Sequence, residues 1–304
     1  MKIHILHDFV GGAWGGGNQF LKALRQYLME NGLYADHYQS ADTILVNSKD
    51  HLDFAFQLKK QFNCKIIHRI DGVFGIYRND PRLDDMVHSF ASKVADGVIF
   101  QSEWSQKTHK ERGFIDTHPY ETVIYNAANP NIFNTDYKKE KNKKIKLITT
   151  SWSSNWGKGF KTLQYLDEHL DFEKYDYEFI GQSPVKFKNI KMTSPLPQEV
   201  LVKIMKKCDI FITATENDTC SNSLLEALSC GLPAIGLNSG GTPELISTGG
   251  RIYNEMDELL GVIDDVSTNI NSFKKKINIK SFEDIAEEYI KFISKSSHRT
   301  RWNK

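Results

Sequence analysis

The sequence predicts an α/β protein with two domains, each a parallel β-sheet covered by helices, that face each other across a cleft. The chain of 304 residues suits two domains of about 150 residues each. Short apolar runs alternate with helical patterns through both halves, which is typical of parallel sheets. The halves also open alike, because the runs Lys2 to Leu6 and Lys144 to Thr149 each precede a glycine-bearing loop and an amphipathic helical pattern. These observations indicate two Rossmann-like domains.

In the first half, short β-rich runs predict the strands of the first sheet. After the opening run, they are Thr43–Val46, Lys65–Ile70, Gly97–Gln101 and Thr122–Tyr125. The helical pattern that follows the opening run carries Phe20, Leu24 and Leu28 on one face. We expect this first domain to span residues 1–135.

The second half repeats this alternation. Its further strands are predicted at Tyr177–Ile180, Asp209–Ala214 and Ala234–Leu237, and two of its helices at Val200–Lys207 and Ser223–Ser229. The polar, lysine-rich residues 136–144 read as a linker, so the second domain spans residues 145–280. The last helical pattern, Phe282 to Ser294, lies beyond the second sheet. We expect residues 281–304 to pack back onto the first domain.

Composition excludes several classes of protein. With 40% hydrophobic and 25% charged residues the chain reads as an ordinary globular protein, and its net charge of +1 creates no field that favours nucleic acid. No apolar run approaches the roughly 20 residues of a membrane helix, and the first residues lack the pattern of a signal peptide. The four cysteines have no metal-binding spacing. We therefore expect a cytoplasmic protein.

The segment Ala214 to Leu245 carries the clearest candidates for ligand binding. An apolar run ends there, a polar loop follows, and a helix begins near Asn222 or Ser223. Helix N-termini present unpaired N–H groups that suit a diphosphate. Asp218 and Glu226 can accept hydrogen bonds from the hydroxyls of a sugar and of a ribose, although each also suits a simple turn or first helical turn. The candidate donor-binding residues here are Asp218, Asn222, Ser223, Leu224 and Glu226.

This segment resembles the donor-binding signature of family 4 glycosyltransferases, which are retaining, nucleotide-sugar-dependent enzymes with the GT-B fold. The signature has two acidic residues separated by seven positions, and then small and apolar residues that end in Gly-x-Pro. The matching positions are Asp218, Glu226, Ala227, Leu228, Ser229, Cys230, Gly231, Pro233, Gly240, Gly241, Pro243, Glu244 and Leu245. The family commonly has glutamate at the first acidic position, where this chain has the shorter Asp218.

A second match lies between a predicted strand and helix, from Ser151 to Phe160. A lysine at such a junction can neutralise a diphosphate, and neighbouring glycines let the backbone approach it closely. The segment resembles the family's phosphate-binding loop, in which an arginine precedes a Lys-Gly pair by five residues. Lys158 and Gly159 match that pair, while Ser153 stands at the arginine position. The alternative is that Lys158 lies in a solvated turn.

The loop after the first strand holds five glycines around a tryptophan. The amides of Gly15, Gly16 and Gly17 can close over a phosphate or an acceptor. The loop lacks G-x-G-x-x-G, because Phe20 takes the place of the third glycine, and this disfavours a dinucleotide-dependent oxidoreductase. It resembles the loop of the glycosyltransferase N-domain that contacts the donor diphosphate.

Ionisable residues end the predicted strand Lys65–Ile70, and the carboxyl end is the functional end of a parallel strand. In the resembling enzymes this strand end carries a polar residue, often histidine, near the reacting carbon. Asp71 is therefore a candidate catalytic residue, with His68 and Arg69 behind it. The alternative is that Arg69 and Asp71 pair with each other and cap the strand.

The first domain resembles the family only weakly. It is expected to be short for the family, lacking strand–helix material between Gly32 and Lys65. Segments Phe100 to Trp104 and Val123 to Asn126 resemble stretches that flank the cleft in the family. Because acceptor sites lie in this domain, the acceptor stays open between a glycan, a lipid and a small molecule.

Together these features predict a retaining, hexosyltransferase-like enzyme that uses a UDP-sugar or GDP-sugar. Asp71, Lys158 and Asp218 are the predicted catalytic residues, with Lys158 and the helix N-terminus stabilising the departing diphosphate. No aspartate pair has D-x-D spacing after a strand, so we expect no metal and no cofactor. Two alternatives stay open: a non-catalytic nucleotide-sugar-binding relative, favoured by Ser153 and the short first domain, and a nucleotide-sugar epimerase.

Two lysine runs, Lys138–Lys146 and Lys274–Lys276, read most simply as a solvated linker and a helix surface. The alternative is weak docking on anionic lipid, worth about 1 kcal/mol per basic residue near the surface. That alternative would place a cytoplasmic protein peripherally at a membrane.

Overall fold

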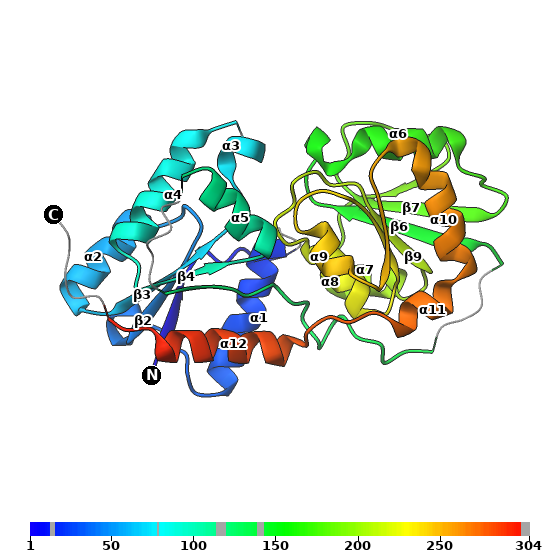
Figure 1. Cartoon of the computed structure of the whole chain (residues 1–304). Coiled ribbons are helices and arrows are strands. Elements are labelled where there is room, and N and C mark those ends of the chain that lie inside the picture. Colours follow the sequence, from blue (N-terminus) through cyan, green and yellow to red (C-terminus); the bar gives the residue numbers. More distant parts are fainter. Residues whose placement is uncertain (13–15, 78, 114–119, 139–142, 299–304) are drawn as a thin grey trace. The chain divides into compact units, whose positions relative to one another are not determined.

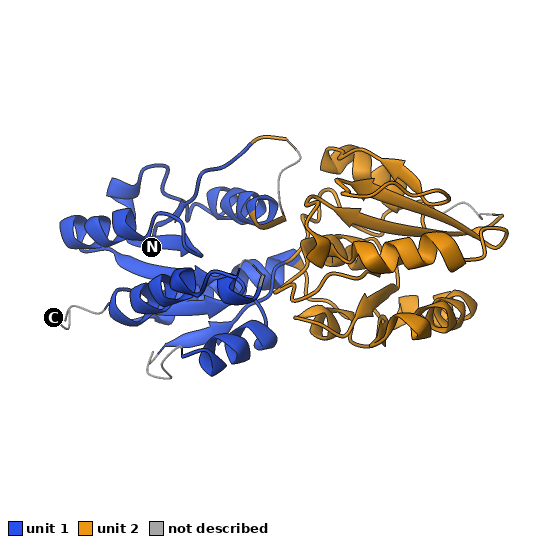
Figure 2. Cartoon of the chain, turned by 90° about the horizontal axis from the view of Figure 1, so that it is seen from above, with its two compact units in different colours: residues 1–10, 18–126, 282–304 blue, residues 11–17, 127–281 orange. Residues whose placement is uncertain are grey.

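The computed structural model describes residues 1–12, 16–77, 79–113, 120–138 and 143–298. The chain divides into two compact units, drawn in different colours in Figure 2. Unit 1 comprises residues 1–10, 18–126 and 282–304, and unit 2 comprises residues 11–17 and 127–281. The chain thus passes into unit 2 after Asn126 and returns to unit 1 at Phe282.

Unit 1 contains a five-stranded sheet in which all strands are parallel. Its spatial order follows the chain: β1 (Ile3–Leu6), β2 (Thr43–Asn47), β3 (Lys65–Ile70), β4 (Gly97–Phe100) and β5 (Glu121–Val123). All five strands were predicted from their apolar runs, with ends that differ by at most two residues. The buried sides of β2, β3 and β4 include Val46, Ile66 and Val98, which belong to one hydrophobic core.

Helices cover both faces of this sheet. They are α1 (Gly16–Glu30), the 3₁₀ turn η1 (Tyr38–Ser40), α2 (Leu52–Phe62), α3 (Phe74–Tyr77), α4 (Pro81–Lys93), α5 (Glu103–Glu111) and α12 (Phe282–Lys295). Leu58 of α2 and Phe90 of α4 pack into the core that contains Ile66. The expectation that strand–helix material is lacking between Gly32 and Lys65 is wrong, because β2 and α2 both lie there.

The C-terminal helix α12 packs against α1 within unit 1, and Figure 1 shows the two helices side by side. The ring of Phe20 lies 6.2 Å from that of Phe282 and 5.8 Å from that of Tyr289. The buried residues of α12 recur three or four positions apart, as in an amphipathic helix: Phe282, Ile285, Ala286, Tyr289, Phe292 and Ile293. Burial of this apolar stripe ties the end of the chain to unit 1.

Unit 2 contains a six-stranded parallel sheet. Its order is β11 (Gly250–Tyr253), β10 (Ala234–Leu237), β9 (Ile210–Thr213), β6 (Ile145–Ser151), β7 (Tyr175–Gly181) and β8 (Lys191–Thr193). The chain builds this sheet outward from β6 through β7 to β8, and then outward in the other direction from β9. The order therefore reverses between β6 and β9, and such a switch point is where open α/β sheets bind ligands.

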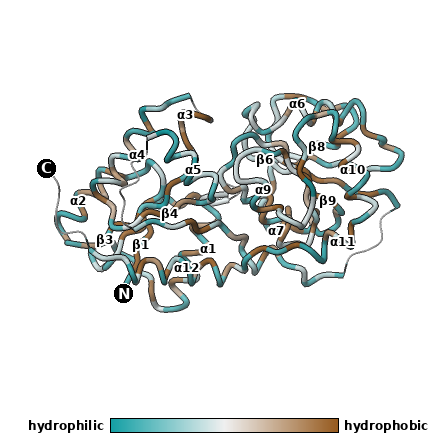
Figure 3. The backbone as a smooth tube through the Cα atoms, in the orientation of Figure 1, coloured by the Kyte–Doolittle hydropathy of each residue, from teal (hydrophilic) through white to brown (hydrophobic). Residues whose placement is uncertain are grey.

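The remaining elements of unit 2 are the 3₁₀ turns η2 (Trp156–Lys158) and η3 (Met256–Glu258) and the helices α6 (Phe160–His169), α7 (Gln198–Met205), α8 (Asn222–Ser229), α9 (Thr242–Ile246), α10 (Leu259–Thr268) and α11 (Ile270–Lys275). Phe160 of α6 and Ile263 of α10 share a core with Phe179 and Ile210 of the strands. Figure 3 shows the apolar strands β4 and β9 in brown, one in each unit. Within the described ranges, no helix is both long and apolar enough to cross a membrane.

Candidate functional site

The strongest sequence candidates in unit 2 lie on two loops at the switch point of its sheet. One loop follows β6 and leads into α6, and the other follows β9 and leads into α8. Because β6 and β9 are parallel neighbours, both loops leave from the same, carboxyl edge of the sheet. The topology therefore brings together Lys158 and Asp218, which are 60 positions apart in the chain.

The first loop holds Lys158 in a defined turn. The side chain of Asn155 accepts a hydrogen bond from the backbone N–H of Gly157 at 2.9 Å and so caps the short 3₁₀ turn that ends at Lys158. Gly159 follows at a φ of +84°, and a Cβ there would lie 2.3 Å from Cβ of Ala214. Glycine is required at this position because the backbones of the two loops approach each other so closely.

The second loop is fixed around Asp218. Its carbonyl oxygen accepts a hydrogen bond from the N–H of Gly241 at 2.8 Å. Gly240 has a φ of +62°, and a Cβ there would lie 2.3 Å from that same carbonyl oxygen. The Gly240-Gly241 pair of the signature thus holds the backbone of Asp218 and leaves its carboxylate to face the first loop.

The side chains of Lys158 and Asp218 form an ion pair, with 3.3 Å between Nζ and Oδ2. The two side chains keep 32% and 19% of their surface exposed. A partly exposed pair of this kind contributes little to stability and exchanges readily with other charged partners. The two motifs recognised separately in the sequence therefore form one charged site that a ligand can enter.

Helix α8 begins beside this pair. Ser221 is its N-cap, and the Ser221 hydroxyl accepts a hydrogen bond from the N–H of Leu224 at 3.4 Å. The helix thus begins at Asn222, within the predicted range, with the capping serine one residue earlier. Asn222 and Ser223 occupy the first turn, where backbone N–H groups point out of the helix and favour an anion.

The glycine-rich loop contacts this helix terminus within unit 2. A Cβ at Gly16 would lie only 2.4 Å from Cβ of Asn222, whereas a Cβ at Gly17 would meet nothing within 4 Å. The backbone of Gly16 therefore lies against the side chain of Asn222, and binding of a phosphate by this loop stays a prediction. Gly15, the third predicted residue, lies outside the described residues.

Glu226 lies on the buried side of α8 and keeps only 8% of its surface exposed. Burial raises the pKa of its carboxyl to about 7, and a hydrogen bond from Gln198 opposes that shift in part. Gln198 Nε2 donates to Glu226 Oε1 at 2.8 Å. This glutamine is the first residue of α7 and was missed in the sequence, because 28 positions separate it from Glu226 and nothing in its local pattern indicates the contact.

Asp71 lies in unit 1, directly after β3. Its carbonyl oxygen accepts hydrogen bonds from the Ser105 hydroxyl at 3.2 Å and from His109 Nε2 at 2.9 Å. Its carboxylate accepts a hydrogen bond from the amide of Gln101 at 3.3 Å. The backbone of Asp71 is thus anchored from α5, while its carboxylate keeps a single neutral partner among the residues described.

Arg69 does not pair with Asp71 in the described part of the chain, so that alternative is wrong. The Arg69 side chain is 1% exposed and donates to neutral groups: Tyr289 OH at 3.1 Å, Gln101 Oε1 at 2.7 Å, and the side-chain oxygens of Asn47 and Asn126. The nearby His68 is also buried and donates from Nε2 to the carbonyl of Ser48 at 2.6 Å, so it does not reach the surface. Gln101 links the Arg69 network to Asp71.

No group of three or more histidine, cysteine, aspartate or glutamate side chains is placed to hold a metal ion within the described ranges. All four cysteines are free and buried.

Comparison with known proteins agrees with this architecture. The family model described as glycosyl transferases group 1 matches residues 174–269, a stretch that includes Asp218 and Glu226 and begins after Lys158. A curated sequence, uncharacterized protein 356 of Sulfolobus islandicus rod-shaped virus 1, is 24% identical over 192 residues, which cover 57% of this chain and 53% of the viral protein. The chain thus spans about half the length of that relative.

Solved structures match over nearly the whole chain. HepE of Anabaena in complex with UDP is 15% identical, with 97% of this chain and 100% of that chain covered and a TM-score of 0.76. A glycosyltransferase from Rickettsia africae ESF-5 is 13% identical, with 97% and 99% covered and a TM-score of 0.75. The chain therefore has the two-domain GT-B fold of glycosyltransferases, as the sequence predicted.

Proposed function

We propose that this protein is a retaining glycosyltransferase that moves a sugar from a UDP-sugar or GDP-sugar to an acceptor hydroxyl. The observation that carries the proposal is the Lys158–Asp218 pair, which lies at the switch point of the unit 2 sheet. The match to the glycosyl transferases group 1 model over residues 174–269 supports it. The solved structures of the similar HepE hold UDP and UDP-glucose, which favours a uridine nucleotide as the first donor to test.

In the proposed complex, each charged residue binds a different group of the donor. Lys158 and the N–H groups at Asn222–Leu224 bind the diphosphate, Glu226 accepts hydrogen bonds from the ribose hydroxyls, and Asp218 accepts them from the sugar. Donor binding separates Lys158 from Asp218, because the diphosphate replaces the carboxylate as the partner of the ammonium group. The loss is small, since a partly exposed ion pair contributes only about 0–1 kcal/mol.

The reaction breaks the bond between the anomeric carbon and the diphosphate oxygen, and both electrons of that bond leave with the diphosphate. The acceptor oxygen bonds to the anomeric carbon and gives its proton to the departing phosphate oxygen. Negative charge therefore grows on the diphosphate as the bond breaks, where Lys158 and the α8 terminus stabilise it. We propose that these groups take the place of a divalent metal. The roles of Asp71 as a catalytic residue and of unit 1 as the acceptor domain stay predictions.

A second candidate function is nucleotide-sugar binding without catalysis. Ser153 stands where the resembling enzymes have a second phosphate-binding cation, and its hydroxyl accepts a hydrogen bond from the N–H of Asn155 at 3.1 Å within the loop. Its carbonyl also accepts a hydrogen bond from the hydroxyl of Ser151 at 3.0 Å. Ser153 therefore builds the turn and leaves Lys158 as the cation of this loop.

Thermal unfolding with a panel of nucleotides tests the proposal. UDP or GDP should raise the melting temperature with EDTA present, and NAD should not. A ligand at a hundredfold excess over its Kd stabilises the native state by about 2.7 kcal/mol, which is easily detected. If no nucleoside diphosphate shifts the transition, the proposed donor site is wrong. Incubation with the stabilising donor then separates the two candidates, because only an enzyme releases free nucleotide from it.

A further inference from the structure

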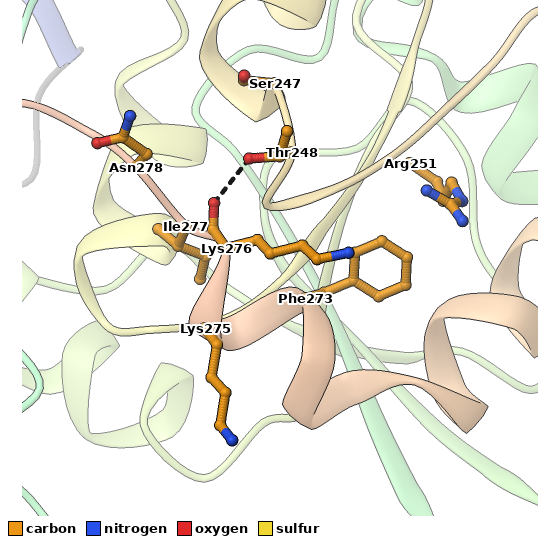
Figure 4. Close-up of a pocket in the computed structure, with 8 residues that line it drawn as sticks. All are labelled: Ser247, Thr248, Arg251, Phe273, Lys275, Lys276, Ile277 and Asn278. Carbon is orange, nitrogen blue, oxygen red and sulfur yellow. Dashed lines mark hydrogen bonds between the residues drawn. The ribbon is translucent and has the colours of Figure 1, made fainter.

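A polar pocket lies in unit 2, away from the proposed donor loops. Its volume is about 700 Å³, and its lining residues, shown in Figure 4, are Ser247, Thr248, Arg251, Phe273, Lys275, Lys276, Ile277 and Asn278. Ser247 and Thr248 precede β11, and Arg251 is the second residue of that strand. The pocket is therefore at the amino edge of the parallel sheet, whereas Lys158 and Asp218 follow the carboxyl ends of their strands.

The polar lining of this pocket consists of cations and neutral groups. Arg251, Lys275 and Lys276 contribute three positive charges, and two hydroxyls and one amide complete the polar lining. No acidic side chain lines the pocket within the described ranges. One lining position, Ser247, has a φ of +45°, a backbone conformation that costs energy in a residue other than glycine and that tends to occur at functional sites.

Two of the cations lie near one buried aromatic ring. The Arg251 guanidinium lies 4.6 Å from the centre of the Phe273 ring, and Lys276 Nζ lies 6.0 Å from it. The backbone of Lys276 is fixed as well, because its carbonyl accepts a hydrogen bond from the Thr248 hydroxyl at 2.8 Å, the dashed line in Figure 4. The same figure shows Lys275 directed away from the ring, at the rim.

Arg251 is also oriented by Asp265, whose carboxylate accepts a hydrogen bond from Nε at 2.8 Å. This contact uses Nε, so the two Nη groups, which form the outer part of the planar guanidinium, take no part in it. A guanidinium fork binds two oxygens of a phosphate in a fixed geometry, and an ammonium group adds a compact charge beside it. Arg251 and Lys276 thus form a prepared site for a tetrahedral anion.

We propose that this pocket binds the phosphate group of an anionic ligand, such as the headgroup of phosphatidic acid or a soluble phosphate. The pocket gives a role to Lys275 and Lys276 of the lysine run 274–276, which the proposed sugar transfer does not use. A lipid headgroup bound there would attach unit 2 to an anionic membrane surface. The inference does not depend on the proposed transferase activity, because its residues are at the opposite edge of the sheet.

The test combines two probes with matched variants. Binding is measured at low salt to inorganic phosphate by calorimetry, and by sedimentation to vesicles of phosphatidylcholine with and without phosphatidic acid. The double variant Arg251→Gln/Lys276→Gln removes two charges from the pocket, and Lys276→Gln alone is the milder change if the double variant unfolds. Lys161→Gln/Lys203→Gln removes two charges from exposed positions of α6 and α7 and is the control.

The proposal predicts that the parent binds vesicles only when they contain phosphatidic acid, and that salt weakens this binding. The pocket variant should bind at least tenfold more weakly, and the control variant should bind like the parent. Binding of inorganic phosphate without vesicle binding, lost in the pocket variant alone, would assign the site to a soluble ligand. Binding of neither probe, or an equal loss in the pocket and control variants, would overturn the proposal.

Discussion

The two sheets of this protein differ in the exposure and the partners of the cation near their carboxyl edges. In unit 2, Lys158 and Asp218 form a partly exposed ion pair between two loops. In unit 1, the cation Arg69 is 1% exposed and is enclosed by Asn47, Gln101, Asn126 and Tyr289, which are all neutral. The first arrangement keeps a cation available to a ligand, and the second uses a cation to join strands and helix α12.

The difference shows that position at a functional edge does not by itself make a charged residue a ligand-binding residue. Arg69 lies near the carboxyl end of β3, and Lys158 lies in the loop that follows the carboxyl end of β6, the edge where parallel sheets place their sites. Burial and hydrogen bonding distinguish the two residues. Every part of the Arg69 guanidinium has a protein partner, whereas Lys158 has one partner among the residues described, and a diphosphate can replace it. We therefore expect Lys158 to exchange Asp218 for a ligand, and we expect Arg69 to have a structural role.

The largest expected effect is on stability, from Arg69→Met. The substitution removes the guanidinium that donates to the side-chain oxygens of Asn47, Gln101 and Asn126, of which Gln101 Oε1 keeps the Asn126 amide as a donor at 3.2 Å. Each buried group that is left unsatisfied costs about 1–3 kcal/mol. We expect the free energy of unfolding, measured with urea, to fall by about 3–5 kcal/mol. The control is Arg82→Met, whose side chain is 88% exposed and which should change stability by no more than about 0.5 kcal/mol. Similar losses in both variants would contradict the structural role of Arg69.

The next effect concerns Glu226 and pH. Its pKa of about 7 in the folded protein lies above the value of about 4.3 expected in the unfolded chain. Between these values the folded state keeps a proton that the unfolded state loses, so stability falls as pH rises through this range and is constant above it. In Glu226→Gln this contribution, about 4 kcal/mol, should be absent. We therefore expect the free energies of unfolding of parent and variant, measured with urea at several pH values, to become more similar as the pH is lowered.

If the two proteins lose stability in parallel with rising pH, Glu226 is ionised in the folded state and the burial argument fails. The result also bears on the donor site. Burial disfavours the ionised form of Glu226 in the free protein, and a ligand that donates hydrogen bonds to the carboxylate would stabilise that form.

The smallest predicted effect distinguishes two adjacent glycines. Gly16→Ala places a Cβ against Asn222 at the start of α8, whereas Gly17→Ala places one in open space. Overpacking of this kind costs about 1–3 kcal/mol, so we expect roughly tenfold weaker binding of UDP or GDP for Gly16→Ala. Gly17→Ala, an identical chemical change one residue later, should bind like the parent. Equal affinities for the two variants would show that the glycine-rich loop does not define the nucleotide site.

The sequence predicted strands β3 and β10 to the residue, because each is a short run rich in apolar residues between polar or turn-forming residues. It did not predict β8 or β11, which are short and begin with Lys191 and Gly250, residues that do not favour strands. The sequence placed the start of α8 near Asn222 or Ser223 and did not identify Ser221 as its N-cap, since all three are good capping residues and only the fold selects Ser221.

Contacts between distant segments were beyond sequence reasoning. The partners of Arg69 are the last residue of β2, residues that follow β4 and β5, and Tyr289 of α12. Their convergence depends on the strand order β2-β3-β4-β5, which local patterns do not encode. The contact between Gln198 and Glu226 has the same origin, because it joins the first residue of α7 to the middle of α8. The donor signature, in contrast, was visible in the sequence because its residues are close together in the chain.

The central claim is that Lys158, Asp218 and Glu226 bind the parts of one nucleotide sugar. The most direct measurement is calorimetric titration of free UDP or GDP into the parent and into Lys158→Ala, Glu226→Gln and Asp218→Asn. Lys161→Ala, which removes an exposed lysine three positions further on, is the control.

Hydrogen bonds to charged groups contribute about 1.5–3 kcal/mol, so Kd should rise by roughly ten- to a hundredfold for Lys158→Ala and for Glu226→Gln. Asp218→Asn and Lys161→Ala should leave the affinity for the free nucleotide nearly unchanged, because the proposed partner of Asp218 is the sugar. If Lys158→Ala and Glu226→Gln bind nucleotide as tightly as the parent, these residues serve only the turn and the helix, and the proposed donor site is contradicted.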